Sequence, residues 1–224
     1  MRINIPAQIL FSILCHLFFL NSLLFASTDV GGPIYTDSLW GKGGSPYVIT
    51  KTLKIHNGAT LTIDPGVEIL FEEGSEFIVE GEIVAKGASN NPILISSKDQ
   101  YLKCGTITFN KNSVGASYTD AGVYIKGSIF EYVIIDSIYG IEFEGSSAYL
   151  NNVIYRNSNN LKYKHVSSKS HIHESYFDSN TTSPNNSGNN GGAIFFYSSM
   201  SLSLKNCTFD NNSASRNGGA IFHS

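Results

Sequence analysis

Gly191-Gly-Ala-Ile-Phe-Phe-Tyr-Ser-Ser199, continuing to Cys207-Thr-Phe-Asp-Asn-Asn212, is one copy of a pattern that fills the chain from Gly140 to Phe222. Its Ser-Ser pair recurs at positions 146, 167 and 198, so the steps between copies are 21 and 31. The longer step contains the Asn/Ser/Gly/Pro-rich run Thr181–Asn190, which accounts for the difference as an inserted loop. A further copy begins at Gly218-Gly-Ala-Ile-Phe222. A repeat of this length predicts a solenoid.

The segments between these markers are short and rich in β-branched and aromatic residues, and Gly, Asn and Ser bound them. Such segments favour strands over helices. One coil alone cannot bury its apolar face, whereas stacked coils add strands to shared parallel sheets. The sequence therefore predicts an all-β, right-handed parallel β-helix with three strands and about 21–24 residues per coil.

One repeat position carries large apolar residues, Ile135, Tyr155, Phe177 and Phe209, at steps of 20, 22 and 32. If these side chains point inward, so do those two positions earlier, because strand side chains alternate. The residues directly after the apolar set then form an outward surface ladder. Because neighbouring strands lie about 4.8 Å apart, this ladder would place an arginine between the carboxylates of the two adjacent coils. The inward set two positions earlier is Val133, Val153, Ser175 and Cys207, and the surface ladder is Asp136, Arg156, Asp178 and Asp210.

The N-terminal residues 1–27 have Arg2 followed by a nearly continuous apolar run to Phe25 and small residues at its end. This pattern predicts a secretory signal peptide, with an uncleaved membrane anchor as the alternative. Residues 28–46 are expected to form an N-terminal cap and residues 47–224 the β-helix, which stops in mid-coil. Trp40 in the cap either covers the open end of the core or stacks on a ligand.

Removal of the signal would leave 14 basic and 18 acidic side chains, a net charge of −4. A weakly acidic chain of this kind is a poor nucleic-acid binder. Cys104 and Cys207 are the cysteines that would stay. Cys207 fits a small buried side chain on the inward ladder, and a bridge to Cys104 is the alternative, although it would join distant coils.

The region from Tyr47 to Ser97 has alternating apolar triplets separated by Gly, Pro and Asn turns, with a step of 22 from Leu61 to Ile83 and of 24 from Ile69 to Ile93. It then becomes less regular. Between strands expected at residues 107–109 and 123–125 lies a loop at 110–122, which we expect to form the wall of a groove.

Two resemblances to known families follow from particular motifs. Gly58-Ala-Thr-Leu-Thr-Ile-Asp-Pro-Gly-Val67, Val79–Gly87 and Asn91-Pro-Ile-Leu-Ile-Ser-Ser97 resemble the opening coils of secreted pectin-lyase-like β-helix proteins. A second set of motifs is similar to the paired Gly-Gly-Ala-Ile and Phe-x-x-Asn repeats of chlamydial-type polymorphic outer membrane proteins. This resemblance implies a surface-exposed, adhesin-like passenger. The repeat residues are Gly191, Gly192, Ala193, Ile194, Gly218, Gly219, Ala220 and Ile221, with Phe177, Asn180, Phe209 and Asn212.

A catalytic interpretation of the surface ladder competes with a structural one. Polysaccharide lyases need a base and cation-holding carboxylates, and hydrolases need paired carboxylates. The four ladder residues offer these groups, but the repeat itself already explains their positions. The Gly-Gly pairs at 191–192 and 218–219 lack a following helix, so they indicate tight coil corners and not phosphate loops. We therefore expect no catalytic residue.

His171 and His173 lie two apart on one predicted strand and so share a face, with His165 in the same coil. A pair of this kind could hold a metal. The alternatives are an exposed polar strand, which we favour because ligands with convincing spacing are lacking, and a pH-sensitive surface. The sequence thus predicts no metal and no cofactor.

Asparagine rises from five residues in 28–150 to 14 in 151–217. Asparagine tolerates left-handed turns and can stack along a solenoid, which gives Asn157, Asn180 and Asn212 a structural role. Four asparagines also stand in Asn-x-Ser/Thr acceptor sequences. We expect the two at or in the inserted loop to be accessible and the two near the stacked core to be hidden. In that order they are Asn180, Asn185, Asn206 and Asn211.

Together these observations predict a secreted or cell-surface repeat protein that recognises cell-surface glycans or proteins, at an outer membrane or envelope if the source is bacterial. Outward aromatic residues such as Tyr176 and Tyr197 would support recognition. The alternatives are a carbohydrate-active enzyme of the pectin-lyase-like group and a structural spacer. Membrane association is expected only through an uncleaved signal or a further C-terminal region.

Overall fold

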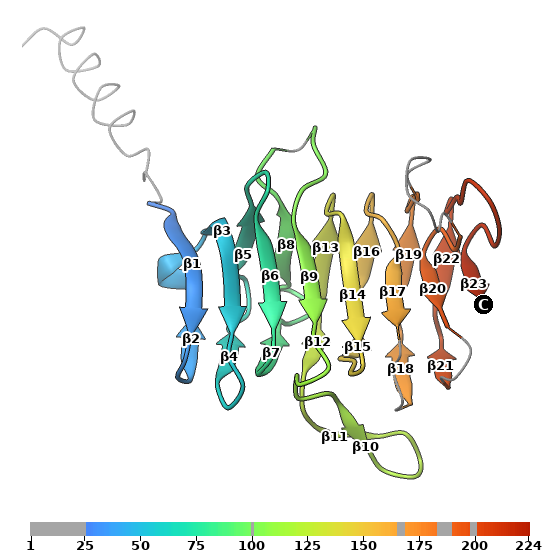
Figure 1. Cartoon of the computed structure of the whole chain (residues 1–224), viewed down its shortest axis with the longest axis horizontal. Coiled ribbons are helices and arrows are strands. Elements are labelled where there is room, and N and C mark those ends of the chain that lie inside the picture. Colours follow the sequence, from blue (N-terminus) through green and yellow to red (C-terminus); the bar gives the residue numbers. More distant parts are fainter. Residues whose placement is uncertain (1–25, 100, 165–168, 183–189, 198–200) are drawn as a thin grey trace, which may run out of the picture.

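The computed structural model describes residues 26–99, 101–164, 169–182, 190–197 and 201–224. Of the predicted signal peptide, only residues 26 and 27 are described. Asn185 and His165 also lie outside the described residues. Nearly all regular structure is strand, and successive strands stack side by side along one axis from the N-terminal to the C-terminal end (Figure 1). Within the described ranges, no helix is long and apolar enough to cross a membrane.

Three faces, defined by parallel strands, enclose the core. β3 (Tyr47–Ile55) changes partner along its length, since residues 47–49 pair with β5 and residues 53–55 pair with β6. A 14-stranded sheet therefore has two arms, which we call the first and second faces, and a separate 7-stranded sheet forms the third face. The first face continues through β5 (Glu68–Phe71), β8 (Ile93–Ser97), β13 (Val133–Asp136), β16 (Ile154–Arg156), β19 (Tyr176–Asp178) and β22 (Thr208–Asp210).

The other two faces follow the same order along the stack. The second face holds β6 (Glu76–Val79), β9 (Thr106–Phe109), β14 (Gly140–Glu144), β17 (Leu161–Lys164), β20 (Ile194–Phe196) and β23 (Ile221–His223). The third face holds β2 (Ser38–Trp40), β4 (Thr60–Ile63), β7 (Glu82–Lys86), β12 (Ile129–Glu131), β15 (Tyr149–Asn151), β18 (Ser170–His173) and β21 (Leu202–Lys205). This arrangement is the parallel β-helix that the repeat pattern predicts.

The register of the first face agrees with the sequence alignment. Ile135 pairs with Tyr155, Tyr155 with Phe177 and Phe177 with Phe209, so all three predicted steps are reproduced. Ile69 differs from the alignment. The sequence predicts that it aligns with Ile93, but it pairs with Ile95, the next inward residue along the strand. The difference lies in a tight turn where Ala88 and Asn91 exchange backbone hydrogen bonds before β8 begins.

The core is a stack of inward side chains from all three faces. Ile135, Tyr155 and Phe177 are fully buried, and the Phe177 and Phe209 rings stack at 4.9 Å. Burial of side chains of this size contributes about 1.5–3 kcal/mol each, so the repeating apolar position carries much of the stability. Cys207 packs against this core, but it and Cys104 are both free thiols. The alternative of a disulfide between them is therefore wrong.

The segment expected to be a cap already belongs to the sheets. β1 (Thr28–Ile34) runs parallel to β3, and β2 runs parallel to β4, with a short 3-10 turn at Lys42–Gly44 after them. Trp40 is only 7% exposed, and its ring stacks on Tyr47 at 4.5 Å. Because Trp40 and Tyr47 both belong to the core, Trp40 covers apolar side chains and is not placed to stack on a ligand.

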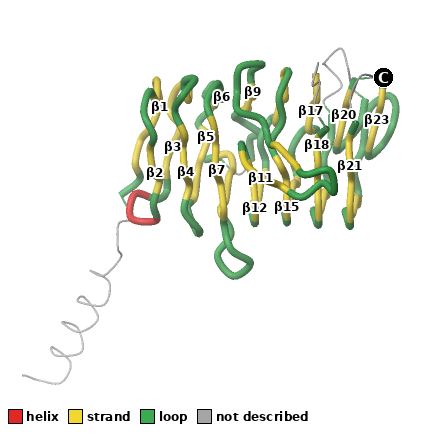
Figure 2. Tube along the Cα trace, turned by 90° about the horizontal axis from the view of Figure 1, so that it is seen from below, coloured by secondary structure: helices red, strands yellow, loops and turns green. Residues whose placement is uncertain are grey.

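One hairpin interrupts the winding between β9 and β12. It consists of β10 (Ser117–Tyr118) and β11 (Tyr124–Lys126), which pair antiparallel, so part of the expected loop at 110–122 is a strand. The hairpin projects from the stack in Figure 1 and lies across the third face in Figure 2. Ala116, Tyr118 and Tyr124 pack there against Ile129 and Tyr149 in a small apolar cluster outside the main core.

Candidate functional site

The coil corners explain why asparagine accumulates in the second half of the chain. From β12 onward, one residue at each of two corners per coil has a positive φ, between 48° and 57°. Asparagine adopts this left-handed conformation more readily than most residues, because its short polar side chain can bond locally. Four of these eight positions are asparagine: Asn152, Asn157, Asn206 and Asn211.

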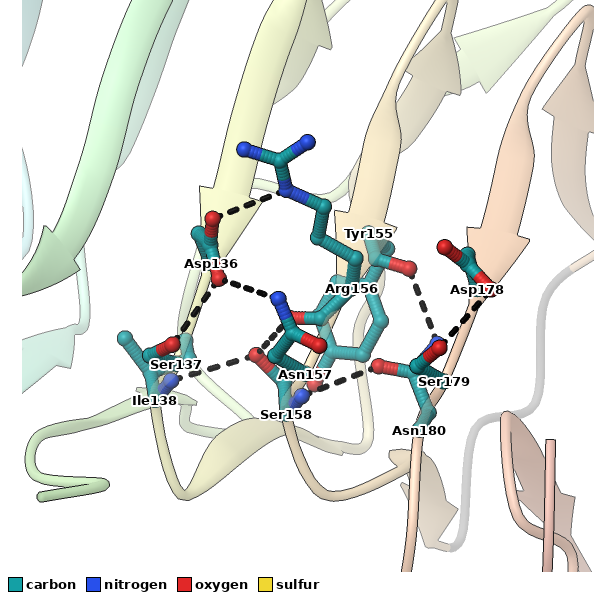
Figure 3. Close-up of polar contacts among 10 residues, drawn as sticks. All are labelled: Asp136, Ser137, Ile138, Tyr155, Arg156, Asn157, Ser158, Asp178, Ser179 and Asn180. Carbon is teal, nitrogen blue, oxygen red and sulfur yellow. Dashed lines mark hydrogen bonds and ion pairs between the residues drawn. The ribbon is translucent and has the colours of Figure 1, made fainter. Parts of the chain in front are cut away.

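The asparagine of the Phe-x-x-Asn motif has a different role. Asn180 is fully buried, and its side-chain nitrogen donates to the Tyr155 carbonyl at 2.8 Å and to Asn212 Oδ1 at 2.9 Å. Its Oδ1 accepts from the Ser158 backbone N–H at 3.1 Å, and Asn212 Oδ1 accepts from that of Asn180. Asn180 and Asn212 therefore form a ladder that satisfies backbone groups where the chain leaves the first face, and Figure 3 shows the Asn180 contacts with Tyr155 and Ser158.

This geometry reverses the expected accessibility of the acceptor asparagines. Asn180 has no exposed surface, so the prediction of an accessible glycosylation site there is wrong. Asn206 and Asn211 are exposed, so the prediction that they are hidden is also wrong. The reason is the left-handed corner conformation, which turns their side chains away from the core. Asn185 lies outside the described residues.

The Gly-Gly-Ala-Ile motif forms the corner before the second face. Gly191 and Gly218 have φ values of 66° and 63°, a region that side chains other than Asn rarely adopt. A Cβ on Gly192 would collide with the Gly219 carbonyl oxygen of the next coil. The backbones of neighbouring coils therefore meet directly here, and Ala193 donates to the Ala220 carbonyl at 2.8 Å.

The surface ladder is in register on the outer side of the first face, and its groups bind one another. Arg156 Nε donates to Asp136 Oδ2 at 2.8 Å, and Asn157 and Ser137 donate to Asp136 Oδ1 (Figure 3). Although burial alone would raise the pKa of Asp136, these hydrogen bonds and the guanidinium charge hold that pKa below its ordinary value. No described contact joins Arg156 to Asp178, so the expected bridge is made on one side.

The other two carboxylates of the ladder are also engaged. Asp178 accepts hydrogen bonds from Ser179 at 2.9 Å and Asn211 at 3.4 Å, and Asp210 accepts one from the Tyr176 hydroxyl at 3.3 Å. Tyr176 is half-buried, while Tyr197 is 40% exposed and its ring contacts Phe195 edge-on. Each aspartate is thus bound to a neighbouring coil or to its own turn, an arrangement that stabilises stacking.

The outer side of the second face carries a charged cluster that sequence reasoning missed. Lys164 Nζ lies 2.7 Å from Glu142 and 3.3 Å from Glu144, and Lys162 lies 3.5 Å from Glu142. Burial would raise the pKa of Glu142, but Lys164 and Lys162 together lower it. The coil repeat could have indicated this cluster, because Glu142 and Lys162 are paired residues one coil apart.

The hairpin and the third face enclose a pocket of about 320 Å³. His171 lies in it with both ring nitrogens buried and, within the described part of the chain, without hydrogen-bond partners. The Tyr118 ring packs against the imidazole at 4.1 Å. Burial, together with the nearby charges of His173 and Lys169, lowers the pKa of His171. The pocket is lined by Ala116, Ser117, Tyr118, Thr119, Asp120, Gly122, Lys169 and His171.

The two histidines share the outer face as the sequence predicts, but the prediction of an exposed polar strand is wrong for His171, which the hairpin covers to 7% exposure. The two rings are also bonded differently. His173 Nδ1 is hydrogen-bonded to the Tyr149 hydroxyl at 3.0 Å, whereas the His171 ring has no such partner among the residues described. Across the same residues, no group of three or more His, Cys, Asp or Glu side chains could hold a metal ion. The expected third histidine, His165, lies outside the described residues.

The comparisons with known proteins match only parts of this chain. Residues 206–224 match the model of the Chlamydia polymorphic membrane protein repeat. A segment of 65 residues is 38% identical to the Drosophila melanogaster protein named Protein bark beetle, and it covers 29% of this chain and 2% of that protein. No solved structure matches. The chain is thus a parallel β-helix whose last coil is similar to the polymorphic membrane protein repeat, as its Phe-x-x-Asn and Gly-Gly-Ala-Ile motifs predict.

Proposed function

We propose that this chain is a surface-displayed recognition module, adhesin-like and without catalytic activity, that binds cell-surface glycans. The observation that carries the proposal is the docked hairpin. It breaks the repeat to build a pocket with both polar and apolar lining on the outer side of the third face. Loops that interrupt a rigid scaffold are where binding residues commonly lie.

The state of the surface ladder favours recognition over catalysis. A general acid or base must be able to reach the proton that it transfers. Asp136, Asp178 and Asp210 instead accept hydrogen bonds from side chains of their own or neighbouring coils. Structural pairing explains them without a substrate, and fold alone does not imply an activity.

The repeat match and the N-terminal sequence support a proposed location at the cell surface. The polymorphic membrane protein repeat at 206–224 supports display at a bacterial outer surface. The apolar run to Phe25 supports secretion by a signal peptide. The motifs in residues 58–97 further support descent from secreted pectin-lyase-like β-helix proteins.

A glycan array probed with the purified protein tests this function, with galacturonan degradation assayed on the same preparation. We expect binding to a subset of glycans without release of products. Turnover that disappears in Asp178→Ala would instead make the surface ladder an active site. Absence of both binding and turnover would favour the structural spacer.

A further inference from the structure

The pocket beneath the hairpin contains a histidine with unmet hydrogen-bonding capacity. His171 is 7% exposed, and neither ring nitrogen has a partner among the described residues. A neutral imidazole has one N–H donor and one acceptor nitrogen. Leaving a buried polar atom without a partner costs about 1–3 kcal/mol, so such an atom indicates a bound molecule or a functional role.

The register of the third face shows that packing does not require a histidine here. The three outward positions that directly precede His171 in the same row are Val84, Ile129 and Tyr149, which are apolar or aromatic, whereas Thr62 precedes them further from the hairpin. Because Leu150 pairs with Ile172, the residues one position earlier on each strand, Tyr149 and His171, lie side by side. An apolar residue at 171 would therefore pack under the hairpin equally well, without two unmet polar atoms.

We propose that this pocket binds one sugar residue of a glycan, with a hydroxyl group of the sugar bonded to a ring nitrogen of His171. A hydroxyl is both donor and acceptor, so it can bond to either ring nitrogen, whichever one carries the proton. The proposal rests on the glycan-binding function above and names the position where the sugar is held.

The rest of the lining fits a small, uncharged polar ring. Asp120 supplies carboxylate acceptors and Lys169 supplies ammonium donors, so the charges of the lining balance. Ala116 and Gly122 supply small apolar surface for ring carbons. A volume of about 320 Å³ is at the lower end for ligand pockets, about 300–1,000 Å³, which suits one ring and excludes an extended oligosaccharide.

The test follows the histidine ring signals of the full-length protein by NMR while methyl glycosides of galactose, glucose and N-acetylglucosamine are added singly. We expect at least one glycoside to shift the His171 signals saturably. His171→Phe keeps an aromatic ring beside Tyr118 but removes both nitrogens. It should weaken binding by about tenfold or more while raising the melting temperature, because two unmet polar atoms are removed.

His173→Phe is the matched control on the same strand and face, because His173 is bonded to Tyr149 and does not line the pocket. It should bind as the unmodified protein does. Asp120→Asn, an exposed hairpin substitution, provides a second variant and should weaken binding several-fold without loss of folding.

The outcomes separate the pocket from the wider function. Glycan-array binding that persists while no glycoside shifts the His171 signals would overturn the pocket assignment and leave the recognition function intact. Equal binding by His171→Phe and the unmodified protein would do the same. Saturable binding of glycine, used as a zwitterionic competitor, without binding of any glycoside would overturn the assignment to a sugar.

Discussion

At the residue scale, two buried tyrosines allow the contribution of a hydroxyl group to stability to be distinguished from that of the aromatic ring. Tyr155 and Tyr163 both point into the core and are nearly fully buried. The Tyr155 hydroxyl donates to the Asn159 carbonyl at 2.6 Å, whereas the Tyr163 hydroxyl has no hydrogen-bond partner among the described residues. Burial raises the pKa of both, so both hydroxyls keep their protons at neutral pH.

We predict opposite effects of removing these two hydroxyls. Tyr163→Phe removes an unmet polar atom and should stabilise the protein by about 1 kcal/mol, while Tyr155→Phe leaves a carbonyl without its donor and should destabilise it by a similar amount. Urea unfolding of the two variants measures the difference. A loss of stability in Tyr163→Phe would mean that the hydroxyl has a partner in the folded protein.

Asn180 is the residue whose removal should be most costly among the asparagines. Asn180→Ala breaks the ladder between Tyr155, Ser158 and Asn212 and should cost about 3 kcal/mol, since several buried groups lose partners together. Asn206→Gly, at an exposed left-handed corner, is the control and should change stability by less than about 1 kcal/mol. Thermal unfolding of both variants tests the contrast, and similar losses would contradict it.

At the scale of single elements, the hairpin packs over a titratable group, His171. A neutral His171 fits beneath it, and its pKa is lowered by burial and by nearby positive charge. Asp120 and Lys169 line the same pocket, Tyr118 packs on the ring from the hairpin, and Tyr149 and His173 flank it on the third face. Asp120 is the group of opposite charge in the lining.

We predict that the hairpin loosens in acid. Because the folded-state pKa of His171 lies below the ordinary value of about 6.5, the undocked form binds more protons, and docking weakens as pH falls below about 6.5. The hydrogen-exchange protection factors of residues 117–126, which compare the observed rate with the intrinsic rate at each pH, should therefore fall between neutral pH and pH 5. His171→Phe should abolish this fall in protection. An equal fall in that variant would assign the effect to another group.

The elements also show which parts of the fold a sequence can specify. The first-face register is predictable from β13 onward, because Ile135, Tyr155 and Phe177 repeat with the coil, but not between β5 and β8, where close copies are lacking. The sequence predicts the second strand of the hairpin, at 123–125, but takes the first strand as part of a loop, since the hairpin packs on Tyr149 and His171, which are distant in sequence. The predicted accessibility of Asn180 and Asn211 is wrong in both directions, because side-chain direction at a corner depends on φ, which the motif alone does not reveal.

At the scale of the whole molecule, the strands of each coil pair only with strands of neighbouring coils. Stability is therefore close to a sum of coil and interface terms. Phe177 lies between Tyr155 and Phe209 in the stack. Strands early in the chain, such as β5, pair with other strands of the N-terminal coils.

We predict that Phe177→Ala loosens the C-terminal coils and spares the N-terminal ones. The substitution should cost about 3–5 kcal/mol through the cavity that it leaves. Hydrogen exchange followed by mass spectrometry should show lost protection in residues 153–182 and 201–224, with residues 47–97 unchanged. A uniform loss along the chain would indicate that the stack unfolds as one cooperative unit.

The coils keep their register across very different lengths of connecting chain. The connection from Val84 to its partner Ile129 includes the whole hairpin, whereas the connection from Ile129 to Tyr149 is a single plain coil. Because the corner that carries the hairpin lies outside the core, the scaffold can exchange one exposed segment for another without repacking. A chain with the proposed recognition function can change its ligand by exchange of this one segment, and we expect sequence variation in related chains to concentrate there while the interior stays constant.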